Sequence, residues 1–396
     1  MDAKKKQMCD MIDGMRDELL SMGDSIFDRP ELGFEEYFAS NLIEDFLEKN
    51  GFHVERGLGS LKTAFRAIYE HGTGGPSIGL LCEYDALAGI GHACGHHLQG
   101  PCIAAAAIAL SKADIKEPYK IVVYGTPAEE GGGGKSVMLK EGFIGDVDVA
   151  LMMHGSQTTT CDIKSMAIHH IDVTYEGVGS HAAIAPHKGR SALDALLLAF
   201  QGTEFLREHV PEDTRIHYTV ADTFNIPANV VPCKAKGTFI LRSYNSFVLE
   251  KVRERFENVI RGAAMMTETE ATIEYTSSMP GKIPVLSLNK VLIDCAEEIG
   301  APNISEPRKK PGSTDLAEVM QHIPGSCIRV SFAPLTAAPH SREYLDNGKS
   351  ETGHAAIIYG AKTLANASYE LITKPELMKE IQDEFKERKE KMKKEA

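Results

Sequence analysis

The chain has 396 residues, of which 43% are hydrophobic and 25% are charged, as in an ordinary globular protein of two or three domains. Its formal net charge of −13 argues against a nucleic-acid-binding protein, because such proteins usually carry a basic face. The longest strongly apolar stretch, Cys102 to Leu110, is far shorter than the roughly 20 residues of a membrane span. The eight cysteines are too sparse for a disulfide scaffold and indicate a reducing compartment. We therefore expect a soluble, cytoplasmic protein with neither nucleic acid nor membrane as a partner.

The first third of the chain alternates helical and strand-like segments. The spacing of apolar residues predicts helices at 8–22, 36–51 and 100–110. Short apolar runs predict strands at 77–82, 120–124 and 148–153. This alternation is typical of an α/β fold, in which a mainly parallel sheet carries helices on both faces.

The pattern changes between residues 168 and 279. The order there is strand–helix–strand–strand–helix–strand, which matches a ferredoxin-like α+β unit. The α/β pattern returns after Pro280, with helices expected at 285–300, 315–321 and 353–369 and a strand at 326–333. We therefore expect a catalytic domain made of residues 1–167 and 280–396, interrupted by a smaller domain at 168–279.

The densest group of reactive side chains directly follows the strand expected at 77–82. It contains Glu83, Asp85, His92, Cys94, His96 and His97. Ligand sites of parallel sheets form beyond the carboxyl ends of the strands, which is where this segment would lie. Thiolate, imidazole and carboxylate together suit Zn, Co, Ni or Mn, and Gly95 lets Cys94 and His96 approach one ion. A buried thiol beside surface histidines is the alternative interpretation.

A second group, Glu129 and Glu130, follows the strand expected at 120–124 and precedes four glycines. One carboxylate could bind a metal while the other stays free as a general base, although a solvated acidic turn would look similar. Gly134-Lys135-Ser136 resembles the end of a phosphate-binding loop. Because Glu129 stands where that motif requires its first glycine, nucleotide binding is not expected.

Three further histidines are candidates. His154 ends the strand expected at 148–153, and His340 is the obvious distant ligand; singly, either residue would more often be structural. Ser180 and His181 are adjacent, so their side chains would diverge on a strand, and they do not form a convincing nucleophile pair. A histidine that polarises a carbonyl group is the better interpretation of His181.

In this order the motifs resemble those of the co-catalytic metallopeptidase family of aminoacylases and carboxypeptidases, peptidase family M20. Within it the chain is most similar to the amidohydrolase branch of aminobenzoyl-glutamate hydrolase, the auxin–amino-acid hydrolases and β-alanyl-lysine dipeptidase. The similarity extends over about residues 30 to 365. The matching segments are Glu83–Leu87, His92–His96, Pro127–Gly131, His154–Gly155, Ser180–Ala183, Asn229–Pro232, Gly312–Asp315 and His340–Glu343.

The resemblance implies a metal-dependent amidohydrolase or peptidase that binds two divalent ions per subunit. Cys94 would bridge the ions, Glu130 and His340 would complete one site, and His96 and His154 would complete the other. Glu129 would be the general base that takes a proton from the attacking water.

The resemblance also implies a homodimer formed through the inserted domain, which would act as a lid and dimerisation domain. His181 would reach the active site of the partner subunit, and Asn229 and Arg242 match lid positions that can hold a substrate carboxylate. Asp85 and His97 are expected beside the ligands. His97 departs from the family pattern, in which Asn or Asp is usual at that position, and could shift the metal preference.

The expected reaction is therefore cleavage of an amide bond in a small carboxylate-bearing substrate. A dipeptide, an aminobenzoyl-glutamate-like amide and an N-acyl amino acid all remain candidates. Two other functions stay open. One is a cysteine hydrolase in which Cys94 is the nucleophile and His96 or His154 the base; the other is a non-catalytic binding protein or partner subunit on the same scaffold.

Overall fold

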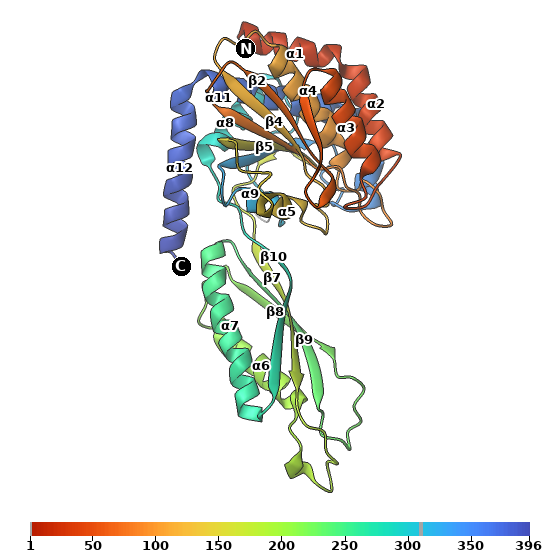
Figure 1. Ribbon diagram of the computed structural model, residues 1–396, viewed down its shortest axis with the longest axis vertical. Helices are drawn as coiled ribbons and strands as arrows, with labels where there is room; N and C mark the ends of the chain where they lie inside the picture. Colours follow the sequence, from red (N-terminus) through yellow and green to blue (C-terminus); the bar gives the residue numbers. More distant parts are fainter. Residues whose placement is uncertain (1, 309–311) are drawn as a thin grey trace. The chain divides into compact units, whose positions relative to one another are not determined.

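The computed structural model describes residues 2–308 and 312–396, which form two compact units (Figure 1). The first unit comprises the chain up to Ile163 together with Ile283–Arg388. The second comprises Lys164–Lys282 and Lys389–Ala396. Within the described ranges, no helix is both long and apolar enough to cross a lipid bilayer.

The first unit contains a seven-stranded sheet in the order β1-β2-β4-β3-β5-β11-β6. Its four central strands, β4, β3, β5 and β11, are mutually parallel, whereas β1, β2 and β6 pair antiparallel towards the edges. The predicted mainly parallel arrangement is confirmed, and the β1–β2 hairpin is an addition. The strands are β1 His53–Leu58, β2 Leu61–His71, β3 Ser77–Cys82, β4 Tyr119–Gly125, β5 Val149–Ser156, β6 Thr160–Cys161 and β11 Gly325–Ser331.

Helices cover both faces of this sheet (Figure 1). One face carries α3 (Tyr37–Lys49), α4 (Gln99–Lys112), α8 (Leu286–Glu298) and α11 (Glu351–Thr373), against which α1 (Ala3–Gly14) and α2 (Arg16–Phe27) pack. The other face carries the short helices α5 (Gly134–Lys140) and α9 (Leu316–Val319), and buries Met138 and Leu316 against the strands. Because helices cover both faces, both sides of the central strands are buried, which explains why these strands are apolar almost throughout. The single helix predicted at 8–22 is wrong, since α1 ends at Gly14 and α2 begins at Arg16, with Met15 between them.

The second unit is an antiparallel sheet with two helices on one face. Its elements are β7 (Ala167–Glu176), α6 (Ala192–Arg207), β8 (Arg215–Asp222), β9 (Lys234–Ser243), α7 (Ser246–Thr267) and β10 (Glu270–Met279). The sheet order is β10-β7-β9-β8, the order of a ferredoxin-like unit. Every second residue of β9 is buried, because that face packs against α6 and α7 around Phe239 and Phe256.

The charged C-terminal segment forms a helix, α12 (Pro375–Lys394), for which the sequence analysis made no prediction. Ion pairs four residues apart run along it, for example between Lys379 and Asp383. Met378, Ile381 and Phe385 are buried on its other side. Glu384 accepts hydrogen bonds from the first residues of α8, which attaches this part of α12 to the first unit.

Candidate metal centre

The candidate centre lies where the central parallel strands end. Glu83 follows β3, the segment from Thr126 to Glu130 follows β4, and His154 is near the end of β5. Because these strands are neighbours and parallel, their carboxyl ends meet at one edge of the sheet. His340 comes from the segment after β11, and its backbone N–H donates to the Ala93 carbonyl at 3.0 Å, which fixes that segment beside Cys94.

The structure brings five expected ligands into two groups that share Cys94. One group is Cys94, His96 and His154, and the other is Cys94, Glu130 and His340; within each group the possible ligand atoms lie within 4.8 Å of one another. Cys94 Sγ is 3.6 Å from His154 Nε2, and His340 Nε2 is 3.7 Å from Glu130 Oε1.

The donor atoms fit a divalent cation. His96 Nε2 and Glu130 Oε1 are buried and have no hydrogen-bond partner, which is costly for a polar atom unless it binds an ion. Thiolate, imidazole and carboxylate are also the donor set that Zn and its neighbours accept. His340 has a left-handed backbone (φ 65°), an unfavourable conformation for this residue that is often found at functional sites.

Asp85 contacts one residue of each ligand group, His96 in the first and Glu130 in the second. Its Oδ1 is 3.0 Å from His96 Nδ1, and its Oδ2 accepts the backbone N–H of Glu130 at 2.9 Å. The first contact places a proton on Nδ1 and leaves Nε2 of His96 available as a ligand atom.

Burial and neighbouring charges shift the pKa values of the three candidate ligands Cys94, His154 and His96 in different directions. Burial raises the pKa of Cys94 to about 12, so its thiolate requires a nearby positive charge. Burial, together with Arg329 and His96, lowers the pKa of His154 to about 3 and keeps that imidazole neutral, the form that binds metals. Although burial opposes it, Cys94 and Asp85 hold the pKa of His96 well above its usual value.

Glu129 lies beside these groups with its side chain 14% exposed and 4.0 Å from His96 Nε2. Burial, followed by the nearby charges of Glu83 and Asp315, raises its pKa to about 8. The preceding Ala128 has a positive φ of 57° and donates its backbone N–H to the buried carboxylate of Glu36 at 2.8 Å. This anchored, strained turn fixes the direction of the Glu129 side chain.

His97 does not join the ligand groups. Its Nε2 is 3.1 Å from the Gly348 carbonyl, and its ring meets Phe27 edge-on with centroids 4.8 Å apart. Burial lowers its pKa to about 4.

The candidates of the second unit lie at two places. Ala182 donates its backbone N–H to the Asn229 carbonyl at 2.9 Å, so His181 and Asn229 are neighbours near the end of β7 where Glu176 pairs with Lys234. Arg242 is at the other end of β9, opposite Ile168. Arg242 lies eight positions along the strand from Lys234, a distance of about 27 Å at roughly 3.4 Å per residue.

Three charged residues at the centre are not predicted from the sequence, and two of them, Lys135 and Asp315, are fully buried. Lys135 forms ion pairs with Glu83 and Asp315, and Arg329 approaches His154 Nδ1 to 3.2 Å. In the sequence Asp315 stands out only as the last residue of the segment Gly312–Asp315, and Lys135 only by its place after a glycine run. Nothing local in the sequence marks either of them as buried.

Comparison with known proteins agrees with this geometry. The sequence model of peptidase family M20/M25/M40 matches residues 81–368. The chain is 32% identical to human Xaa-Arg dipeptidase, over 98% of this chain and 93% of that protein. It is 29% identical to one of the p-aminobenzoyl-glutamate hydrolase polypeptides of Escherichia coli, over 96% and 94% of the two chains. A Bacillus subtilis protein described as a dinuclear metal-binding peptidase of the M20 family shares the fold with a TM-score of 0.70, at 18% identity, over 91% of this chain and 99% of that one.

Proposed function

The chain belongs to peptidase family M20/M25/M40, a family of metallopeptidases and amidohydrolases, and from this premise we propose that it hydrolyses an amide bond in a small carboxylate-bearing substrate. The observation that carries the proposal is the pair of ligand groups that share Cys94, with Glu129 beside them. The relatives are named for three substrate classes: a dipeptide, an aminobenzoyl-glutamate and an N-acylated amino acid. A member of one of these classes is the proposed substrate.

We propose two divalent ions per subunit, drawn from Zn, Mn, Co and Ni. Cys94 would contact both, Glu130 and His340 would hold one, and His96 and His154 would hold the other. Bound there, the ions would supply a nucleophilic water near neutral pH and polarise the amide carbonyl.

Glu129 would move the proton in this reaction. Its carboxylate would take a proton from the water as the oxygen attacks the carbonyl carbon, and would give that proton to the amine nitrogen as the C–N bond breaks. Burial supports this role, because a carboxylate with a raised pKa is a better base and can also release its proton to the leaving amine.

For the second unit we propose a lid that forms a homodimer, in which His181 polarises the carbonyl in the partner's active site. His181 and Asn229 lie at one end of the sheet and Arg242 lies at the other, so they could contact the same small substrate only from different subunits. The edge strand β8 and the adjacent helix α6 expose apolar side chains, among them Phe205 and Val220, which suits a subunit contact. The low count of eight cysteines in 396 residues, too few for a disulfide scaffold, suits the proposed cytoplasmic location.

The test is amine release from the three substrate classes by protein stripped with a chelator and reloaded with Zn, Mn, Co or Ni. Glu129→Gln is expected to keep its metal and lose at least about 100-fold in kcat, the usual contribution of a general base. Glu141→Gln, an exposed carboxylate on another loop that accepts hydrogen bonds from Ser60, is the matched control and should be unaffected. Near-normal turnover by Glu129→Gln would refute the assignment.

Other outcomes of the same assay identify the alternatives. Activity that survives the chelator and is abolished by thiol alkylation would indicate a cysteine hydrolase, which the raised pKa of Cys94 disfavours. Full metal loading without turnover of any amide would indicate a binding protein. Mixing His181→Ala with a Glu129→Gln subunit should restore part of the activity if His181 acts across the dimer; no restoration after subunit exchange contradicts that role.

A further inference from the structure

Lys135 is a fully buried cation beside the candidate centre, and the proposed reaction gives it no role. Its Nζ is 2.6 Å from Glu83 Oε1 and 2.6 Å from Asp315 Oδ1, and all three side chains have no exposed surface. The backbone N–H of Lys135 also donates to Asp315 Oδ2 at 3.3 Å. The three side chains form a buried ion triad with two negative charges and one positive charge.

Glu83 connects the triad to a proposed ligand. Its second oxygen, Oε2, accepts a hydrogen bond from Gln99 Nε2 at 2.7 Å and lies 3.3 Å from His96 Nε2. Gln99 in turn accepts the backbone N–H of Glu83 at 3.1 Å. The carboxylate of Glu83 is therefore held between Lys135 on one side and Gln99 on the other.

The triad also faces the proposed base. Carboxylate oxygens of Glu83, Glu129 and Asp315 lie within 4.8 Å of one another, a spacing that could hold a cation. The ammonium group of Lys135 already contacts two of the three carboxylates, so it stands where such a cation would be. Without it, Glu129 would lie next to two unpaired buried carboxylates that repel it.

Stability alone is a poor explanation for this arrangement. Removing two carboxylates and an ammonium from water costs about as much as their attraction returns, and apolar residues of similar volume often replace such groups without loss. The triad lies next to the proposed base, Glu129, and next to a proposed ligand, His96, and this position favours a role in the reaction over a purely stabilising one.

We propose that Lys135 is a positioning residue for amide hydrolysis, holding Glu83 and Asp315 so that the Glu129 carboxylate keeps its direction toward the reacting water. The inference rests on the proposed function. Lys135 contacts no substrate in this arrangement, so its loss should lower kcat and leave KM nearly unchanged. Replacing Lys135 also removes a positive charge near the ligands, and this change should not weaken metal binding.

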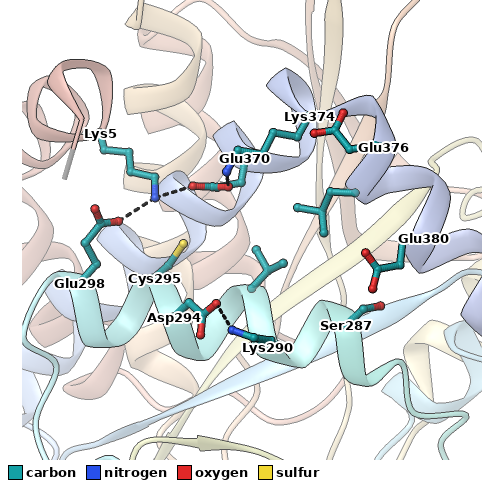
Figure 2. Close-up of a pocket in the computed structure, with 12 residues that line it drawn as sticks. Lys5, Ser287, Lys290, Asp294, Cys295, Glu298, Glu370, Lys374, Glu376 and Glu380 are labelled. Carbon is teal, nitrogen blue, oxygen red and sulfur yellow. Dashed lines mark hydrogen bonds and ion pairs between the residues drawn. The ribbon is translucent and has the colours of Figure 1, made fainter.

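The chain offers a matched control in Lys5. This side chain is 8% exposed and also pairs with two carboxylates, Glu298 at 2.7 Å and Glu370 at 2.6 Å. Lys5 lines a cavity of about 610 Å³ formed by α1, α8, α11 and α12, and none of the candidate site residues is in its lining. Figure 2 shows Lys5 in this cavity, between Glu298 and Glu370. Lys5→Met therefore removes the same kind of ion triad away from the reaction.

The experiment compares Lys135→Met, Lys5→Met and the double variant Lys135→Met/Asp315→Asn, each loaded with metal. We expect Lys135→Met to lose about 10- to 100-fold in kcat, as a small misplacement of a reacting group does, with KM within about twofold. Its metal Kd, measured by chelator competition, should be no weaker than that of the wild type. The double variant should recover several-fold in kcat because it removes one of the two carboxylates that Lys135→Met leaves without a positive charge. Lys5→Met should lower Tm and leave kcat unchanged.

The inference is overturned if kcat of Lys135→Met is no lower than kcat of Lys5→Met. It is also overturned if excess metal fully restores kcat of Lys135→Met. If Lys135→Met shows no cooperative unfolding, Asp315→Asn replaces it, and a folded Asp315→Asn with unchanged kcat overturns the inference equally. Wild-type protein that cleaves none of the substrates contradicts the proposed function, and this inference with it. Wild-type activity combined with an unaffected Lys135→Met contradicts the inference alone.

Discussion

Asp85→Asn, which exchanges one carboxylate oxygen for an amide nitrogen, should disturb the candidate metal centre. The Asp85 side chain is 1% exposed and accepts from two donors, the imidazole of His96 at 3.0 Å and the backbone N–H of Glu130 at 2.9 Å. An Asn side chain has one oxygen that accepts and one NH2 group that only donates. It therefore cannot accept from both His96 and the Glu130 N–H, and one of the two contacts is lost. If the amide group faces His96, it donates to Nδ1 and moves the ring proton to Nε2, where it blocks ligation.

The expected size follows from the lost contact. A hydrogen bond to a charged group contributes about 1.5–3 kcal/mol, which corresponds to about a 10- to 150-fold weaker metal Kd. Supporting residues behind metal ligands have effects in the same range. We therefore expect Asp85→Asn to remain folded by circular dichroism and to bind Zn at least about tenfold more weakly, measured by competition with a chromophoric chelator.

Asp146→Asn is the control for this measurement. Asp146 also accepts several hydrogen bonds, from Tyr124, Lys120 and Arg66, but it precedes β5 and so lies at the amino ends of the parallel strands. Equal Zn affinity of Asp85→Asn and Asp146→Asn would show that Asp85 does not support the ligands, and would refute the reasoning.

Two further predictions concern stability and the loop after β4. Although burial opposes it, hydrogen bonds from Ser287 lower the pKa of Glu384 from 4.5 to about 2, so the stability it provides is present above pH 4.5 and is lost as pH falls toward 2. Glu384→Gln should therefore lower Tm at pH 7, and the difference should vanish near pH 2; a constant difference would contradict this. A Cβ at Gly134 would overlap the Pro127 carbonyl oxygen, whereas one at Gly131 meets no atom within 4 Å. Gly134→Ala should lose stability and activity in melting and turnover assays, and Gly131→Ala neither; similar values for both would contradict the described loop.

The parts of the fold that sequence analysis predicted are those whose signals are local. Apolar runs of strand length and a change of pattern near residue 168 were enough for the parallel centre and the ferredoxin-like order. The β1–β2 hairpin was missed because β1 is half exposed and carries charged residues such as Glu55 and Arg56. In α12 the spacing of Met378, Ile381 and Phe385 is helical, but the many Lys and Glu residues around them obscured it.

The candidate site divides in the same way. The expected ligands lie together because each is close to the carboxyl end of a strand or in the segment after it, and strand ends are visible in the sequence. The triad of Lys135 required the fold itself, since Glu83 is 52 residues and Asp315 is 180 residues away along the chain. His97 is a case in which the sequence was misleading. Its position next to His96 suggested that both rings share one environment, but the tight 3-10 turn at His96–Leu98 directs the two rings to different partners.

The pairing of β5 with β11 has a consequence for how the protein is made. During synthesis β3, β4 and β5 leave the ribosome before the whole ferredoxin-like unit, and β11 follows only after it. Until then the growing chain has an open, apolar strand edge at β5, which is prone to pair with other chains. His340 is translated later still, so the nascent polypeptide cannot assemble the full set of proposed ligands on its own. The sheet and the proposed ligand set can therefore be completed only after the last quarter of the chain has been synthesised. Translation products that stop before β11 should aggregate through β5.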